Sequence, residues 1–398
     1  MSLMQPLYLS HYTLTTCLGQ GCQANWGAII EQRTGLQPCE FETAMLPTFI
    51  GQVEDVDADA LPPRLSDYLC RNNQLAQLAL KQDGFCGAVE EAIQAYGRHR
   101  IGVFLGTSTS GILSTEIAYR HRDKQTGALP GDFHYAHTHN TFSVSSFVRD
   151  YFELEGPAVA VSSACSSSAK VFGNAARMMA CGVIDAAIVG GVDSLCLTTL
   201  YGFNSLELLS NERCQPFGSQ RKGISISEAA GFALLTRQKP VFGTAIAITG
   251  VGESSDAHHM SSPHPQGAGA LASMQQALDM AGLAANQIDY INLHGTATRS
   301  NDAAEGLAVA ALFGSSVPCS STKGHTGHAL GAAGIVEAIL CALSIENQLL
   351  PGGVTTQEVD ASLKINYLLE NKVSAPRAVI SNSFGFGGSN CSLLLEQQ

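Results

Sequence analysis

One cysteine and two histidines stand where short apolar segments of this sequence end and small residues follow. Cys165 lies in VSSACSSSAK, His294 lies in LHGTATRSND, and His328 closes STKGHTGH. A thiol becomes a nucleophile when it loses its proton, and an imidazole can take that proton or donate to a developing negative charge. These residue types together indicate nucleophilic catalysis by a cysteine.

Cys165 taken alone supports two interpretations. A cysteine among small residues can fill a core, where free Cys is common. It can also be a nucleophile if a strand ends near residue 163 and a helix begins at about residue 165, because the helix dipole then lowers the pKa of the thiol. The two histidine motifs and the glycine loop SNSFGFGGSN, residues 381–390, favour the nucleophile, since backbone N–H groups of such a loop can stabilise an oxyanion.

The elements that must position these residues alternate along the chain. We expect strands at 101–106, 157–163, 185–191, 244–252, 288–294, 317–321, 377–383 and 391–397, and helices at 166–181, 268–281 and 329–346. This alternation predicts a layered α/β fold. A strand followed by a helix rich in Ala and Gly occurs once in each half, which predicts a duplication with units 1–240, carrying Cys165, and 241–398, carrying the His and Lys motifs.

Composition narrows the function classes. The chain has 398 residues, 45% of them hydrophobic, and a net charge of -12, which does not favour nucleic-acid binding. Its 12 cysteines form no CxxC pair, the N-terminus lacks a signal-peptide pattern, and charged residues interrupt the apolar segments. We therefore expect a cytoplasmic protein with reduced thiols and no membrane span. The histidine-rich stretches 134–140 and 256–264 lack metal-ligand spacing, so we expect no metal.

Six motifs resemble those of the elongating β-ketoacyl-acyl-carrier-protein synthases, in the family's order. They are ACSSS, HGTAT followed by Asp302 and Glu305, STKGHTGH with GAAG, NSFGFGG, CQPFGSQRKG and SSDAHHMSSP, the last closer to the type II branch. The resemblance covers nearly the whole chain. It implies the thiolase fold, with duplicated halves in five α-β-α-β-α layers, and a homodimer.

The same resemblance implies a decarboxylating Claisen condensation of acyl-carrier protein with malonyl-carrier protein, in fatty-acid or polyketide elongation. Cys165 would carry the acyl chain as a thioester, and His294 and His328 would assist decarboxylation. The backbone N–H groups of Cys165 and Phe386 would form the oxyanion hole. No intrinsic cofactor is expected, because the acyl carrier protein supplies the phosphopantetheine arm.

Further residues match family positions. Lys323 would have a structural and electrostatic role, with Glu305 the favoured partner and Glu337 the second. The residues expected to contact substrate are Thr296, Thr298, Phe203, Phe384, His259 and Ser261. Arg299, Asn301 and Lys222 depart from the family pattern, which leaves the substrate open and favours a specialised enzyme.

Other functions stay open. A CoA-dependent thiolase would place a second cysteine in the C-terminal glycine loop, where this chain has Phe384 and Phe386, and a non-elongating chain-length-factor subunit would lack Cys165. Type III synthases use a His and an Asn, and a cysteine hydrolase would leave the Lys323 motif unexplained. The basic run Arg120, Arg122 and Lys124 is either a solvated helix end or a docking patch for an acidic carrier protein, with Arg64 and Arg71 as further members.

Overall fold

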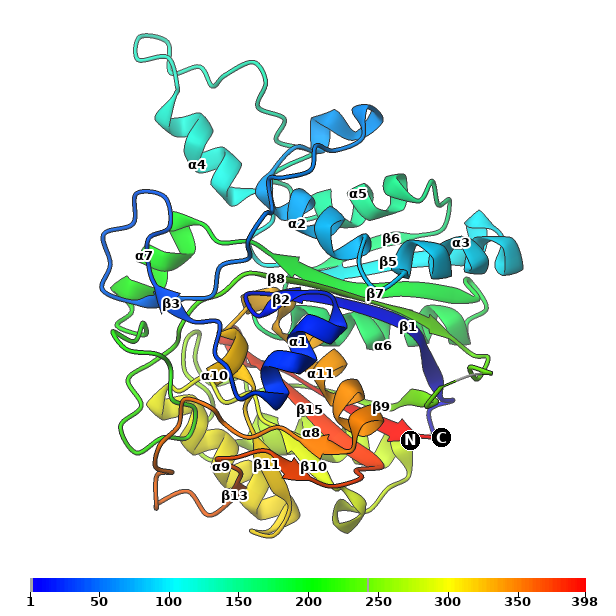
Figure 1. Ribbon diagram of the computed structural model, residues 1–398, viewed down its shortest axis with the longest axis vertical. Coiled ribbons are helices and arrows are strands. Elements are labelled where there is room, and N and C mark those ends of the chain that lie inside the picture. Colours follow the sequence, from blue (N-terminus) through cyan, green and yellow to red (C-terminus); the bar gives the residue numbers. More distant parts are fainter. Residues whose placement is uncertain (1–2, 242) are drawn as a thin grey trace.

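Two sets of five strands share one order and one pattern of directions in the computed structural model, which describes residues 3–241 and 243–398 (Figure 1). The first set runs β6 (Ala158–Val161), β5 (Ile101–Gly106), β7 (Ala186–Asp193), β8 (Ala229–Thr236) and β1 (Leu7–Thr16). The second runs β11 (Pro318–Ser320), β10 (Tyr290–Asn292), β15 (Ala378–Gly385), β16 (Ser389–Gln397) and β9 (Ile246–Ser255). In both sets the first three strands are parallel and the last two antiparallel to their neighbours.

The two sets are joined at their antiparallel ends. Leu7 of β1 pairs with Ile248 of β9, so the hydrogen-bonded path continues from one half to the other. The predicted boundary at residues 240 and 241 falls between β8 and β9. The division of the chain into separate domains there stays a prediction.

Helices form three layers around the two sets of strands. Helices α2 (Arg71–Leu80), α3 (Phe85–Tyr96) and α5 (Ser143–Tyr151) cover the first set, and α8 (Ala268–Ala281) and α9 (Arg299–Phe313) cover the second. Between the sets lie α6 (Ser167–Ala180) and α11 (Ala333–Asn347). This is the predicted five-layer arrangement, with one apolar core around the central helices that contacts both sets of strands and one under each outer helix layer.

The remaining elements are short or lie at the edges. They are α1 (Cys22–Ile30), α4 (Ile112–Arg120), α7 (Leu197–Ser205), α10 (Lys323–Thr326), β2 (Gly19–Gln20), β3 (Gln37–Pro38), β4 (Phe49–Ile50), β12 (Leu349–Leu350), β13 (Asn366–Tyr367) and β14 (Lys372–Val373). Short 3-10 turns lie at Pro63–Tyr68, Arg98–Arg100, Ala285–Gln287, Leu330–Ala332 and Phe386–Gly388. Helix α4 and the loop after it project from the body of the molecule (Figure 1).

Small residues let the two central helices approach closely. A Cβ on Gly334 of α11 would lie 2.6 Å from the backbone nitrogen of Ala169 in α6, which no real side chain tolerates. Residues Leu330–Asn347 are apolar and long enough to cross a membrane, but 89% of that segment is buried in the fold. Helix α11 is therefore a core helix, and its buried position carries the histidine motif that precedes it into the centre of the molecule.

Candidate active site

A strained turn carries Cys165 between β6 and α6. Ala164 has a φ of +53°, which is costly for a residue with a side chain and is found where the surroundings hold it in place. Three hydroxyl contacts do this: Ser166 Oγ donates to Ser163 O at 2.9 Å, Ser167 Oγ donates to Ala164 O at 2.6 Å, and Ser163 N–H donates to Ser167 Oγ at 2.9 Å. The serines around the cysteine thus stabilise the turn that presents it.

The structure brings Cys165, His328 and His294 together. Nε2 of His328 lies 3.0 Å from Sγ of Cys165, and the two imidazole rings meet edge to face with centroids 5.4 Å apart. One nitrogen or sulfur atom from each residue lies within 4.8 Å of the others. All three residues are buried, so a thiol, a proton acceptor and a second imidazole share one small and nearly dry space.

A cysteine and two histidines at this spacing could also hold a zinc ion. The Lys323 ammonium lies 3.4 Å from Nδ1 of His294, which places a positive charge beside the position that a cation would take. This electrostatic cost favours an organic substrate over a metal. The absence of a metal from the working protein stays a prediction.

Lys323 pairs with Glu337, which corrects the expectation of Glu305. Its ammonium forms a buried ion pair with the Glu337 carboxylate and donates to the backbone oxygen of His294 at 2.6 Å. An ammonium group can only donate, so Nδ1 of His294 accepts from it and the ring proton is on Nε2. Lys323 therefore fixes both the position and the tautomer of His294.

Glu305 has a different position from the one expected. Its carboxylate accepts the backbone N–H groups of His294 and Gly295, each at 2.8 Å, and the side-chain amide of Asn382 at 3.2 Å. Glu305 lies in α9, beneath the turn that follows β10, whereas Glu337 lies in α11 beside Lys323. Glu305 therefore supports the turn that carries His294, and Glu337 is the residue that pairs with Lys323.

Burial controls the charges of the catalytic groups. Burial first, and then the Lys323 charge, hold the pKa values of His294 and His328 well below the ordinary histidine value, so both rings are neutral at physiological pH. Burial also raises the pKa of Cys165 to about 11, opposed by Lys323 and by the Phe386 N–H. The pKa of Cys165 is thus raised and not lowered as expected, because burial of this thiol in the turn before α6 outweighs the groups that favour the thiolate. The thiol therefore needs a neighbouring base.

The glycine loop between β15 and β16 lies against the cysteine. The Phe386 N–H lies close enough to the Cys165 sulfur to favour the thiolate and lower the thiol pKa. Gly387 and Gly388 have φ values of +81° and +72°, and a Cβ on Gly385 would lie 2.9 Å from Ser163 O. Glycine at these positions lets the loop turn sharply and bring a backbone donor to the sulfur.

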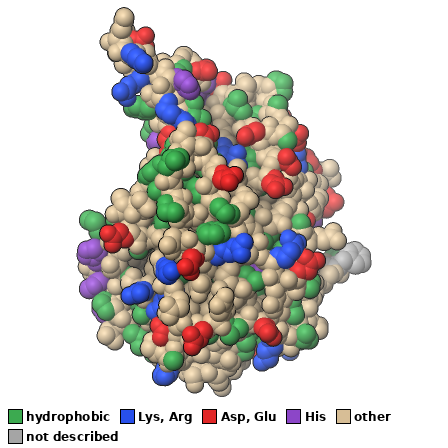
Figure 2. All heavy atoms as spheres, turned by 60° about the vertical axis from the view of Figure 1, so that its left-hand side comes forward, with side chains coloured by type: hydrophobic (Ala, Val, Ile, Leu, Met, Phe, Trp, Pro, Cys, Tyr) green, Lys and Arg blue, Asp and Glu red, His purple; other side chains and the backbone are tan. Residues whose placement is uncertain are grey.

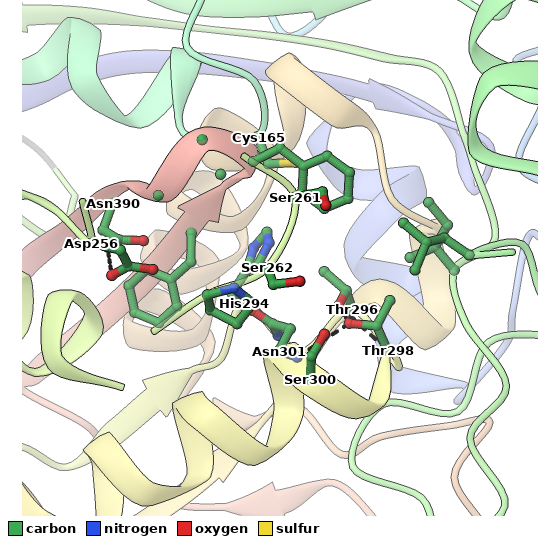
Figure 3. Close-up of a pocket in the computed structure, with 18 of the residues that line it drawn as sticks. Cys165, Asp256, Ser261, Ser262, His294, Thr296, Thr298, Ser300, Asn301 and Asn390 are labelled. Carbon is green, nitrogen blue, oxygen red and sulfur yellow. Dashed lines mark hydrogen bonds between the residues drawn. The ribbon is translucent and has the colours of Figure 1, made fainter. Parts of the chain in front are cut away.

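A cavity opens over the cysteine and histidines (Figure 3). Its lining includes Cys165, His294, His328 and Phe386, and the predicted substrate contacts Thr296, Thr298, Phe203, Phe384 and Ser261. Phe203 and Phe386 pack with ring centroids 5.5 Å apart. His259 does not line it: the ring is exposed, and its Nδ1 accepts the Ser261 N–H at 3.2 Å.

Sequence reasoning missed several lining residues. They are Leu208, Ile224, Asp256, Ser262, Pro263, Ser300, Asn301 and Asn390. Two of them could have been found from the sequence. Asp256 lies in the SSDAHHMSSP motif, and Asn301 is one of the positions that depart from the family pattern. Asp256 accepts from Asn390 Nδ2 at 2.9 Å, which joins the loop after β9 to the start of β16 beside the cavity.

Only part of the basic run Arg120, Arg122 and Lys124 is available to bind a partner. Arg122 and Lys124 are exposed on the projecting segment, where Lys and Arg side chains gather in Figure 2, whereas Arg120 lies 3.2 Å from the Glu42 carboxylate. Arg71 is unavailable, because it forms a buried ion pair with Glu228 at 2.6 Å. Arg64 donates to the backbone oxygens of two residues at the end of α5.

Comparisons with known proteins identify relatives of the whole chain. The beta-ketoacyl synthase N-terminal domain matches residues 13–240, and the beta-ketoacyl synthase C-terminal domain matches residues 246–356. A 3-oxoacyl-[acyl-carrier-protein] synthase 2 from Rhizobium meliloti is 31% identical over 99% of both chains, and one from Vibrio cholerae is 29% identical over 96% of both. The solved complex of the ketosynthase ApeO with its chain length factor ApeC, from Xenorhabdus doucetiae, contains a chain that matches with a TM-score of 0.90 and 38% identity, covering 99% of this chain and 98% of that one.

Proposed function

Because the chain belongs to the β-ketoacyl synthase family, we propose that it joins an acyl group to malonyl-acyl-carrier protein, with loss of CO₂, to give a 3-oxoacyl-acyl-carrier protein. The contact of His328 Nε2 with Cys165 Sγ at 3.0 Å, with neutral His294 beside it, carries this proposal. It supplies a nucleophile with its base and two hydrogen-bond donors for an enolate.

Acyl transfer to the cysteine is the first step. Cys165 gives its proton to Nε2 of His328, and the thiolate attacks the carbonyl carbon of the carrier-bound thioester. The backbone N–H groups of Cys165 and Phe386 donate to the oxyanion that forms. The carbon–sulfur bond to the carrier then breaks, and the leaving thiolate takes the proton from His328. Because the thiol pKa is raised to about 11, this proton transfer depends on His328.

Decarboxylation of the malonyl group needs neutral donors. His294 holds its proton on Nε2. His328 leaves the first step with its ring proton on Nδ1, so a proton exchange with solvent that moves this proton to Nε2 precedes decarboxylation and makes the nitrogen that faced the sulfur a donor. Both donate to the malonyl thioester oxygen as the bond to the carboxylate breaks and CO₂ leaves. A neutral imidazole stabilises the resulting enolate without protonating it, as an imidazolium would.

Condensation follows from the same geometry. The enolate carbon attacks the acyl-Cys165 carbonyl, and the oxygen again meets the two backbone N–H groups. The bond between carbon and Sγ breaks as the 3-oxoacyl product forms, and the cysteine thiolate recovers a proton from solvent. Lys323 and Glu337 act as positioning residues here, since their contacts reach the substrate only through His294.

Substrate delivery involves the polar side of the cavity. Thr296 and Thr298 lie with their hydroxyls 3.0 Å apart in the lining, where they would bind the phosphopantetheine arm that the carrier protein supplies. Phe203, Phe384 and Ser261 would contact the acyl and malonyl groups. Arg122 and Lys124, with Arg120 at their edge, would dock the acidic carrier protein. No other cofactor is required by these steps.

Assembly and setting complete the proposal. We propose a cytoplasmic homodimer acting in fatty-acid or polyketide elongation. The ketosynthase ApeO is solved with its chain length factor ApeC, so a heterodimer with a related chain is the second candidate. The presence of Cys165 in contact with His328 favours the elongating subunit for this chain.

Mass spectrometry tests the function directly. Incubation with an acyl-carrier protein should add the acyl mass to Cys165, and malonyl-carrier protein should then give the 3-oxoacyl product and CO₂. An unmodified protein, with no product in the presence or absence of a related subunit, would contradict the proposal. Light scattering of the pure chain would separate the homodimer from the heterodimer.

A further inference from the structure

We propose that Asp193 is a positioning residue that sets His328 against Cys165. It is the last residue of β7 and fully buried, yet it takes no part in the steps above. The inference rests on the proposed condensing function. It assigns a task in that reaction to a carboxylate that never touches the substrate cavity lining.

Six donors converge on this carboxylate. Five come from the loop after β5: Thr107 Oγ1 at 2.7 Å, Ser108 N at 2.7 Å, Ser108 Oγ at 2.5 Å, and Thr109 N and Oγ1, each at 2.9 Å. The sixth is the backbone N–H of Gly331, at 2.5 Å. Hydrogen bonds to an ionised acceptor are shorter and stronger than neutral ones. The Asp193 carboxylate therefore forms a stable junction between the loop after β5 and the segment that contains Gly331.

The sixth donor links the junction to the catalytic histidine. Gly331 follows His328 by three residues, after Leu330 in a left-handed conformation with a φ of +49°. A Cβ on Gly331 would lie 2.8 Å from both Asp193 Oδ2 and Ser108 N, so the backbone is pressed against the carboxylate. Asp193 thus anchors the chain directly downstream of His328.

The other anchors of this segment are uncharged. The backbone of His328 itself makes two of these contacts: its N–H donates to Ser225 O at 2.8 Å, and its carbonyl oxygen accepts from Ser227 N–H at 3.0 Å. Nδ1 of His328 has no hydrogen-bond partner in the described part of the chain, so no side chain orients the ring from behind. The placement of Nε2 at 3.0 Å from the sulfur therefore depends on the backbone, and Asp193 holds one side of that backbone.

Asparagine at this position tests the role at nearly constant volume. Asp193→Asn replaces one acceptor oxygen by an NH₂ group, which faces donors and cannot replace the lost contacts. We expect kcat for condensation to fall about 100-fold, the typical effect of a shift of about 1 Å between reacting groups. KM for the malonyl-carrier protein should change less than about 3-fold, since the substrate contacts of the cavity are untouched. Asp185→Asn, at the residue directly before the same strand, is the control and should retain wild-type kcat, because Asp185 pairs with Arg100 and not with the His328 segment.

A double-mutant cycle separates positioning from a general structural effect. If Asp193 acts through His328, then Asp193→Asn should lower kcat no further in a His328→Ala background. An equal 100-fold loss in both backgrounds, or wild-type kcat in the single variant, would overturn the proposal. Should Asp193→Asn fail to fold, Ser108→Ala removes one donor and should lower kcat about 10-fold while Tm falls by only about 2–8 °C, so that the protein stays folded at the assay temperature. A wild-type chain that itself fails to condense would contradict the proposed function instead.

Discussion

The ion pair between Lys323 and Glu337 should make stability depend on pH in a specific way once the lysine is removed. Burial raises the pKa of Glu337 to about 7, although Lys323 lowers it. A carboxyl whose folded pKa exceeds its unfolded pKa binds its proton more tightly in the folded state, so stability falls as pH rises from the unfolded pKa to the folded pKa. In the wild type this loss ends near pH 7.

Lys323→Met extends the loss to higher pH. Without the ammonium, the Glu337 pKa rises further, and the Ser383 hydroxyl is the other group that favours the charged form. Each further pH unit then costs about 1.4 kcal/mol of stability. At high pH, where Glu337 must ionise alone, the total approaches the 3–5 kcal/mol, roughly, that is lost when one partner of a buried pair is removed.

Urea unfolding at pH 7 and pH 8.5 measures this effect. The difference in unfolding free energy between wild type and Lys323→Met should grow by roughly 2 kcal/mol over that interval. The control is Lys323→Met combined with Glu337→Gln, which has no titrating carboxyl and should show the wild-type pH dependence over this range. A constant difference between wild type and Lys323→Met at both pH values would refute the reasoning.

The remaining predictions concern activity. Cys165→Ala should form no acyl adduct and no 3-oxoacyl product, measured by mass spectrometry; continued elongation would exclude the thioester mechanism. His294→Ala should lose one enolate donor and lower the rate of CO₂ release by about 100- to 1000-fold while still accepting the acyl group, so equal losses in both steps would contradict its assigned role. Replacing Arg120, Arg122 and Lys124 by Glu should raise KM for carrier-bound substrate and leave kcat unchanged. An unchanged KM would contradict the proposal that these residues dock the carrier protein.

Much of the site could be predicted because its residues follow strands closely in sequence. The ends of β6, β10 and β11 carry the cysteine and histidine motifs within a few residues, so the strand pattern already places them at one edge. The alternation predicts a layered α/β fold, and the family resemblance adds the expectation of five layers. By contrast, β1 and β8 escaped prediction, and their pairing joins segments more than 200 residues apart, a contact that no local pattern encodes.

The errors have a common physical origin in packing at long range. Glu305 is close to His294 in sequence, but its helix places it beneath the turn, whereas Glu337 reaches Lys323 from the central helix. The pKa of the Cys165 thiol is raised chiefly by burial, which depends on the assembled fold and not on the residues beside Cys165 in the sequence. The exposure of His259 and the pairing of Arg71 likewise depend on which surfaces are covered in the assembled fold, and the local sequence does not show this.

The pairing of β1 also bears on how the chain acquires its structure during synthesis. Tyr8 pairs with Thr236, and Leu7 with Ile248, so β1 finds its neighbours only after more than 200 further residues have been made. Contacts of such sequence separation form slowly, and unpaired apolar strands are prone to aggregate while they wait. The nascent N-terminal segment therefore has a long interval of exposure, during which chaperone binding would favour correct assembly, and the nucleophile's half of the molecule matures only as the histidine-bearing half begins to appear.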